Sequence, residues 1–413
     1  MRCINHIWEH RLAAKEKKKR ILFQKFIYTV GIVLVYILGR YLPIYGIDTS
    51  AYRNRTWDAQ ALLLQTVTGD RNQSSVFALG ISPYMIASMI VMVIVACRST
   101  EAKSKISPKK INRVTIEITL ALAVIQAILR VRDLTFVKSS QPLVYFKCMA
   151  IIELIAGAMI ILWLSGRNKK YGIGGQTTLI YINILDGILS TILQADQKDL
   201  RIPLVISFFV IVVVIIMENA EKRIPMQRIS IHNIYADKNY LAIKLNPIGV
   251  MPVMLSTAFF MLPQMVIKVL NSVWPDNTNL LWLDENMVLT RPLGVGVYIA
   301  IIYLLTIVFS IVFISPADLT EQFLKSGDSI VNLQAGKETK WYLIRQIFLI
   351  SLFSATAMSI CMGIPMVLLL EGELKASLVM FPSSMMMLTG IWCSLDREVL
   401  AIKSYESYKP FIS

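Results

Sequence analysis

Runs of about twenty apolar residues recur along the chain, and they restrict the possible folds more than any other feature. A helix of about twenty residues crosses the hydrocarbon core of a bilayer, which is about 30 Å thick, because each residue rises about 1.5 Å. Apolar residues make up 55% of the 413 residues and charged residues 17%, which leaves too little polar surface for a soluble protein of this length. We find no alternation of period two in segments of about ten residues, which a membrane β-barrel would show. The sequence therefore predicts an all-α polytopic membrane protein.

The apolar runs predict about ten membrane-spanning helices. Their expected bounds are Ile21–Leu42, Leu79–Ala96, Ile111–Val131, Leu143–Leu164, Ile173–Leu193, Ile202–Met217, Val250–Leu270, Leu293–Ile314, Tyr342–Gly363 and Ser377–Leu395. Residues 1–20, which precede the first run, are charged and polar, so they do not have the pattern of a cleaved signal peptide.

The basic residues are divided unequally between the two sides of these expected spans. Of the 42 lysines and arginines, 27 lie in the N-terminal segment, the even-numbered connections and the C-terminal tail, and 10 lie in the odd-numbered connections. Basic residues accumulate in short cytoplasmic loops. Both termini are therefore expected in the cytoplasm. Membrane orientation also explains the net charge of +15 better than binding to nucleic acid does.

The residue types that hold metals or perform catalysis do not form a recognisable set. The five cysteines are scattered without paired spacing, and the three histidines (His6, His10 and His232) have no acidic or cysteine partner at a ligand spacing. The chain contains no Gly-x4-Gly-Lys-Ser/Thr phosphate loop, no His-Glu-x2-His and no Gly-x-Ser-x-Gly. We expect no enzyme activity, no metal and no cofactor, so a separate protein must supply the energy for any transport.

Two segments depart from the pattern of simple spans and loops. The stretch Trp57–Phe77 is half apolar but is interrupted at residues 69–71, so it is too polar to cross the membrane in contact with lipid. It is expected to form a re-entrant or external short helix. The polar connection Glu218–Pro247 contains two β-favouring pieces, Arg228–Tyr235 and Tyr240–Leu245, which predict a cytoplasmic hairpin.

Three acidic residues, Glu117, Glu153 and Asp186, fall inside expected spans. Carboxylates at membrane depth are costly and usually have a function. They support an alternative function, an ion-coupled secondary transporter of a small solute. The structural explanation is that they face water or pair with basic residues.

Five short motifs follow one another along the chain, separated by the expected spans. They are Ser75–Tyr84 (SVFALGISPY), Tyr171–Gly175 (YGIGG), the set Leu241, Lys244, Asn246, Gly249, Val250 and Pro252, the set Pro316, Lys325–Gly327 and Gly336, and Tyr405–Ser407 (YES). In this order, from Lys19 to the end of the chain, they resemble the SecY family of protein-translocation channels. The resemblance implies a channel in a bacterial plasma membrane, built from two pseudo-symmetric halves of five helices with a short plug helix. The halves would be residues 21–194 and 195–395, between cytoplasmic segments 1–20 and 396–413, with cytoplasmic loops at 218–248 and 315–341.

Departures from the SecY pattern suggest a subgroup of the family. Leu333–Gly336 (LQAG) stands where SecY channels usually carry an Arg before Pro-Gly at the site that engages the SecA motor. Gln176–Thr178 replaces the usual continuation of the fifth-span turn, and Ser383–Ser384 replaces a Gly-Gly pair. This pattern resembles the accessory SecY paralogues of some Gram-positive bacteria. It implies as partners an accessory SecA-type motor ATPase, a SecE-like small membrane subunit and further accessory Sec proteins. The implied cargo is an unfolded preprotein, a serine-rich glycosylated adhesin.

The resemblance also locates a pore and a plug. A ring of apolar side chains can seal a narrow waist by packing and dewetting, while offering a moving chain no strong binding site. Methionine suits such a ring because its side chain repacks easily. The implied ring is Ile81, Met85, Thr177, Tyr181, Met251, Met254 and Leu388, for which an ordinary bundle core is the alternative. The implied plug is the segment 57–78, with Leu62, Leu63, Leu64, Val67 and Gly69, for which an external surface loop is the alternative.

The lateral gate of such a channel would lie between the second and third spans on one side and the seventh and eighth on the other. Gln126, Ser256 and Thr257 are candidate polar contacts across it, although the latter two could instead bond to their own helix. The sixth and eighth connections would dock the motor. The implied contacts are Arg223, Arg228, Lys325, Gln334, Lys337 and Lys340, and the alternative is that these basic residues serve only as a topology signal.

Overall fold

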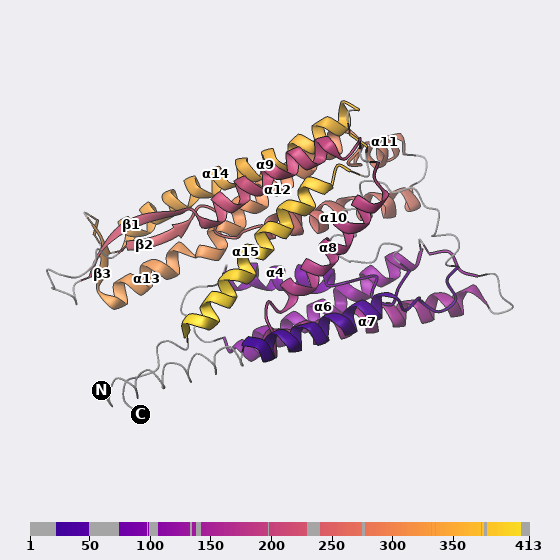
Figure 1. Ribbon diagram of the computed structural model, residues 1–413, viewed down its shortest axis with the longest axis horizontal. Helices are drawn as coiled ribbons and strands as arrows, with labels where there is room; N and C mark the ends of the chain where they lie inside the picture. The colour runs from indigo at the N-terminus through magenta and orange to yellow at the C-terminus, as the bar shows by residue number, and fades with distance from the viewer. Residues whose placement is uncertain are drawn as a thin grey trace, which may run out of the picture.

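The computed structural model is a bundle of helices that carries a small sheet at one end (Figure 1). It describes residues 22–48, 74–96, 98, 106–132, 134–137, 142–196, 198–228, 240–274, 277–331, 333–334, 336–372, 374–375 and 378–405. The expected N-terminal segment 1–20 and the residues implied as the plug, Leu62 to Gly69, therefore lie outside the described residues.

A helix stands at each of the ten positions where the sequence predicts a span. These helices are Leu22–Arg40, α4 Ser82–Ala96, α6 Pro108–Arg132, α7 Leu143–Tyr171, α8 Gln176–Gln194, α9 Arg201–Asn219, α10 Met251–Val273, α12 Pro292–Ile314, α14 Lys337–Leu370 and α15 Phe381–Tyr405. Within the described residues, seven helical runs are long and apolar enough to cross a membrane, and Ser82–Val95 is a shorter apolar helix. The chain is thus a multi-pass membrane protein. Two further helices, α11 Thr278–Asn286 and α13 Pro316–Ser326, lie in connections.

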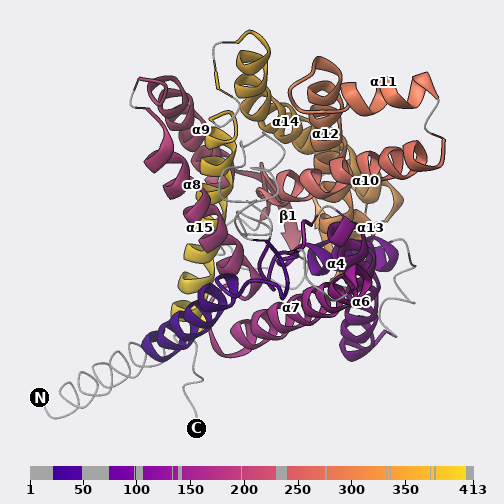
Figure 2. The same cartoon turned by 90° about the vertical axis from the view of Figure 1, so that its right-hand side faces the viewer.

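The helices surround a central region in the view along the bundle (Figure 2). In this view, α8, α9 and α15 lie on one side and α10 lies opposite them, while α12 and α14 close the top and α4, α6 and α7 the bottom. The packing agrees with this order, because α15 contacts both α8 and α9, α10 contacts α12, and α4 contacts α6. Helices from both halves of the sequence therefore face a shared centre.

The second span begins later than the sequence suggested. Gly80 has a φ of +55°, a left-handed backbone conformation that interrupts any helix through this position. The α4 helix therefore begins only at Ser82, with Pro83 in its first turn, and its 15 residues cover about 22 Å. The observed helix is therefore shorter than the expected span Leu79–Ala96.

A three-stranded antiparallel sheet joins two connections that are far apart in the sequence. Strand β1, Glu221–Arg228, pairs on one side with β2, Tyr240–Lys244, and on the other side with β3, Asp328–Ile330. Strand β1 was not predicted from the sequence, and the expected first strand, Arg228–Tyr235, lies outside the described residues except for Arg228. Alternation explains the observed strand, since Ile224 is buried and Met226 is partly buried, whereas their neighbours are exposed.

The sheet has a hydrophobic core of its own. Ile224 and Ile243 from the sheet pack with Phe323 of α13 and with Leu343 and Ile347 of α14, all of them buried. This small core fixes the sheet to α13 and to the first turns of α14. The sixth and eighth connections are consequently one folded unit, which we call the sheet platform (residues 221–228, 240–244 and 316–330).

Candidate functional site: pore, gate and docking surface

Five of the seven residues implied for the waist meet in one hydrophobic cluster. Ile81, Met85 and Met254 are buried in it, and Tyr181 and Leu388 pack against it. They come from the beginning of α4 and from α8, α10 and α15, which are distant in sequence. These apolar side chains leave at most 7% of Ile81, Met85 and Met254 exposed, as a closed waist requires. The pore-ring assignment itself stays a prediction.

The other two implied ring residues, Thr177 and Met251, lie outside that cluster. Both stand in the first turn of their helices, and Met251 is 37% exposed, whereas Met254, one turn further along α10, is buried. Thr177 lines a cavity of about 830 Å³. We therefore expect Thr177 and Met251 to lie at the approach to the waist.

The cavity beside Thr177 lies at the end of the bundle where α7 ends and α8 begins. Its lining comes from α4, α6, α7, α8 and α15: Tyr84, Asn112, Ile116, Met159, Leu162, Trp163, Ser165, Gly166, Arg167, Lys169, Gly174, Gly175, Gln176, Thr177 and Glu398. By the alternation of the helices, the sheet platform lies at this same end. Its lining mixes apolar side chains with the charged Arg167, Lys169 and Glu398, which suits a water-accessible vestibule in front of an apolar waist.

A buried asparagine holds the turn that forms one wall of this vestibule. The side-chain amide of Asn168 donates to the carbonyl oxygens of Ile173 and Gly175, at 2.9 Å each, and its oxygen accepts a bond from Thr29 at 3.0 Å. Gly174 and Gly175 both have positive φ values, of 76° and 51°, which the tight turn between α7 and α8 requires. The turn is therefore fixed both to α7 and to the first helix.

An apolar seam lies where the resemblance implies a lateral gate. Met89 and Val93 of α4 pack against buried Leu255 of α10 and against buried Leu305 and Phe309 of α12. None of these residues was identified from the sequence, where single apolar residues in apolar helices carry no distinguishing signal. Apolar packing gains little over lipid contact inside a bilayer, so such a seam can separate without breaking strong bonds.

The implied polar contacts of the gate behave differently from the seam. The Ser256 and Thr257 hydroxyls donate to the carbonyl oxygen of Val253 in their own helix, at 2.7 Å and 3.4 Å. Gln126 is partly buried on α6 and makes no hydrogen bond to α10 or α12 among the described residues. In this closed arrangement the two helix faces meet through apolar side chains, and the gate role of the three polar residues stays a prediction.

Two of the three acidic residues in the spans have structural partners. The Asp186 carboxylate pairs with the Arg40 guanidinium at 2.7 Å, and the Glu153 carboxylate accepts a bond from the Tyr45 backbone N–H at 3.0 Å. Glu117 is exposed near the beginning of α6. The pairing of Asp186 and Glu153 agrees with the structural explanation of these acids.

Replacing Asp186 by asparagine should lower stability because it leaves the charge of Arg40, whose side chain is only 12% exposed, without its carboxylate partner. Asp186 itself is 48% exposed, so we expect a loss of about 1 kcal/mol, measured by thermal unfolding in detergent. The matched control, Glu117→Gln, should change stability by less than about 0.5 kcal/mol. Solute uptake that depends on Asp186, with unchanged stability, would instead favour the transporter alternative.

The implied plug, 57–78, is described only from residue 74 on, and this last part is held to the residues that follow the first helix. Pro43 and Ser75 form an antiparallel bridge, the Ile44 N–H donates to the Ser74 carbonyl, and the Val76 N–H donates to the Leu42 carbonyl. The described chain therefore leaves and re-enters the bundle at one place, directly before the turn that carries Ile81. The plug assignment itself falls outside the described residues.

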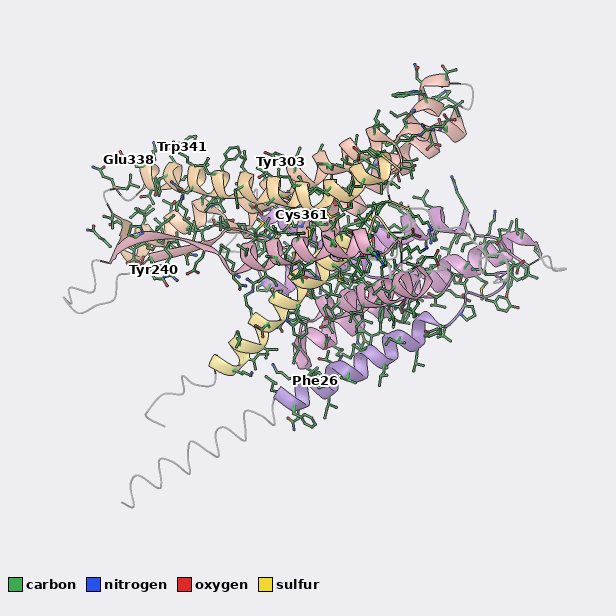
Figure 3. All side chains as sticks on the ribbon, turned by 45° about the horizontal axis from the view of Figure 1, so that its top comes forward. Phe26, Tyr240, Tyr303, Glu338, Trp341 and Cys361 are labelled. Atoms are coloured by element: carbon green, nitrogen blue, oxygen red, sulfur yellow. The ribbon has the colours of Figure 1, made fainter. Side chains whose placement is uncertain are left out.

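The implied motor contacts lie on and beside the sheet platform. Figure 3 shows Tyr240, Glu338 and Trp341 at this end of the molecule. Arg223 is partly neutralised, because it pairs with Glu221 at 2.8 Å and stacks over the Tyr240 ring at 4.7 Å. Lys325 pairs with Glu321 in the same way.

The remaining implied contacts differ in how freely they face solvent. Gln334, Lys337 and Lys340 are exposed, and neither lysine forms an ion pair with any described residue. Arg228 closes β1 opposite Asp328 of β3. We therefore expect Lys337 and Lys340 to contribute most of the free positive charge at this surface.

The comparisons with known proteins agree with this architecture. The sequence profile of the SecY family matches residues 75–395. A protein of Streptococcus agalactiae serotype Ia, named accessory Sec system protein translocase subunit SecY2, is 30% identical over 400 residues, covering 95% of this chain and 96% of that protein. A protein of the same name from Streptococcus parasanguinis is 29% identical over 423 residues, covering 97% of this chain and 100% of that protein.

Solved structures of similar fold are also protein channels. A structure described as a protein conducting channel superposes with a TM-score of 0.66 at 17% identity, covering 93% of both chains. Sec61 in the canine ribosome–channel complex superposes with a TM-score of 0.60 at 16% identity, also covering 93% of both chains. At these identities the likeness concerns the fold, in which ten spans form two halves.

Proposed function

Because this chain belongs to the SecY family and is a protein-conducting channel subunit, we propose that it serves an accessory Sec translocase of a bacterial plasma membrane. Its cargo would be unfolded, serine-rich glycosylated preproteins, and a separate SecA-type ATPase would supply the energy. The observation that carries the proposal is the near-complete match to accessory Sec translocase subunits, together with a folded sheet platform at the same end of the bundle as the vestibule.

The arrangement supports a simple path for the translocating chain. The cargo would enter the polar vestibule beside Thr177, pass the apolar cluster around Ile81 and Met254, and displace the plug on the far side. A signal segment would leave sideways by separating the seam between Met89 and Leu255. The waist would close around the moving chain by repacking of its flexible methionines.

The charge distribution supports the orientation. The sheet platform, the vestibule and the basic connections share one end of the bundle, and the excess of basic residues supports a cytoplasmic position for this end. Both termini would then be cytoplasmic. A SecE-like small subunit would complete the complex, as the family resemblance implies.

Co-purification from native membranes tests the motor assignment. We expect the wild-type channel to retain an accessory SecA-type motor, and Lys337→Glu with Lys340→Glu to reduce the retained motor about tenfold, because two exposed charges are reversed at the docking surface. Arg223→Gln is the matched control and should retain motor within about twofold, since Arg223 already pairs with Glu221. Recovery of only a housekeeping motor would contradict the accessory assignment while leaving the channel assignment intact.

A further inference from the structure

A buried polar cluster joins four segments of the second half at the base of the sheet platform. Its members are Glu218 in the last turn of α9, Asn246 between β2 and α10, Ser354 of α14 and Arg397 of α15. Glu218, Asn246 and Ser354 are each at most 3% exposed. The path proposed for the cargo uses none of these residues.

The members of the cluster are linked by a continuous chain of hydrogen bonds. The Arg397 guanidinium pairs with the Glu218 carboxylate, and its other terminal nitrogen donates to the Glu218 backbone carbonyl at 3.2 Å. The Asn246 amide donates to the second oxygen of Glu218 at 3.3 Å, and the Ser354 hydroxyl donates to the Asn246 side-chain oxygen at 3.2 Å. These bonds therefore connect α9 to α15, α9 to the segment before α10, and that segment to α14. The bond to the Glu218 carbonyl also satisfies a backbone group at the end of α9.

Glu218 depends on this pairing more than Arg397 does. A carboxylate is unfavourable near the carbonyl end of a helix, and burial adds a further cost when no cation is close. The Glu218 side chain is 2% exposed, whereas the Arg397 side chain is 35% exposed and can reach water with its long stem. Loss of Arg397 would thus strand a buried charge, while loss of Glu218 would leave a cation that can turn to solvent.

The cluster also determines where α10 begins. Gly249 has a φ of +70°, and a Cβ at this position would lie 2.8 Å from the Glu218 carboxylate. The next residue, Val250, packs against α15 so closely that a Cβ on Gly390 would lie 2.4 Å from it. Met251 and Met254 follow in the first turn of α10. The same cluster therefore contacts the end of the sheet platform and the first turn of a helix that lines the proposed waist.

We propose that Glu218, Asn246 and Arg397 are positioning residues that lock the sheet platform to α10 and α15, so that a force on the platform is transmitted to the waist. The transmission of force rests on the proposed docking of a motor at the platform, whereas the lock between the platform, α10 and α15 does not depend on a motor. Without the cluster, the platform would remain attached to α14 through its own hydrophobic core but would move relative to α15.

Distances between spin labels in nanodiscs, measured by pulsed electron resonance without motor or cargo, test this lock. Labels introduced as non-canonical residues at exposed Gln227 of β1 and exposed Leu400 of α15 leave all five native cysteines in place. We expect a narrow distance distribution for the wild type and one about twofold broader for Arg397→Gln. Glu218→Gln should broaden it less, and the double variant Glu218→Gln with Arg397→Gln should return close to the wild-type width, because no buried charge remains.

A second pair of labels provides the matched control. Gln227 and Trp341, which is 72% exposed at the beginning of α14, are connected through the hydrophobic core of the platform, so their distance should stay narrow in every variant. An unchanged Gln227–Leu400 distribution in Arg397→Gln would overturn the proposal. A Gln227–Leu400 distribution as broad in the double variant as in Arg397→Gln would also overturn it. Equal broadening of the Gln227–Trp341 distribution would overturn it as well, because it would mean that the whole protein had loosened.

Translocation assays separate this inference from the proposed function. Arg397→Gln should slow motor-driven export, and the double variant should restore it in parallel with the distances. Broadened distances with unchanged export would overturn the transmission role while leaving the channel function intact. Failure of the wild-type chain to export accessory cargo would count against the proposed function, and the distance result would still stand by itself.

Discussion

Replacing Asn168 by leucine should destabilise the channel by about 2 kcal/mol, because the buried Gly175 carbonyl would lose its side-chain donor and the Ile173 carbonyl would lose one of its two donors. Asn168 is fully buried, and leucine has a similar size, so the loss would come from unsatisfied polar groups more than from a cavity. Thr29 of the first helix would lose its bond to Asn168, and the turn would be held to that helix only by the Ile173 N–H, which donates to the Thr29 hydroxyl at 2.9 Å. Since this turn forms a wall of the vestibule, export should fall together with stability.

Thermal unfolding in detergent and an export assay would measure both effects. Thr178→Val is the graded control, because the Thr178 hydroxyl donates only one bond, to the Ile173 carbonyl at 2.8 Å, in the same turn. It should cost about 1 kcal/mol. A leucine variant that unfolds at the wild-type temperature would show that the turn is held by other contacts.

The Gly157→Ala variant should lose about 2–3 kcal/mol of stability and leak ions, because α7 approaches the chain before α4 too closely for a methyl group. A Cβ at Gly157 would lie 2.0 Å from the Val76 carbonyl oxygen and 2.9 Å from its carbon. Val76 cannot move aside easily, since its N–H is bonded to the Leu42 carbonyl at 2.9 Å. The displacement would pass to Ile81, five residues further along, and open the packing of the proposed waist.

A second glycine of the same helix is the matched control for this variant. A methyl group at Gly166 would have no atom within 4 Å, so Gly166→Ala should be neutral or gain up to about 1 kcal/mol from helix propensity. Ion flux into proteoliposomes and thermal unfolding would be measured for both variants. Equal ion flux and equal unfolding temperatures for Gly157→Ala and Gly166→Ala would contradict the close approach of α7 to Val76.

The sequence alone determined the ten helices, because crossing a bilayer requires each span to carry its own apolar residues and to satisfy its own backbone bonds. The span expected at Ile111–Val131 is confirmed by α6, and the span expected at Leu79–Ala96 by α4, which begins three residues later at Ser82. These are local requirements, so a local pattern expresses them.

Only the tertiary structure shows which residues far apart in the sequence pair with each other. Arg40 meets Asp186 across 146 residues and Arg397 meets Glu218 across 179, and no spacing in the sequence relates the members of either pair. In the same way, β3 pairs with β1 although α10 and α12 lie between them in the sequence, and this pairing joins two separate loops into one platform. Polar groups inside a membrane must find partners wherever the packed helices bring them, and only the folded chain shows which partners those are.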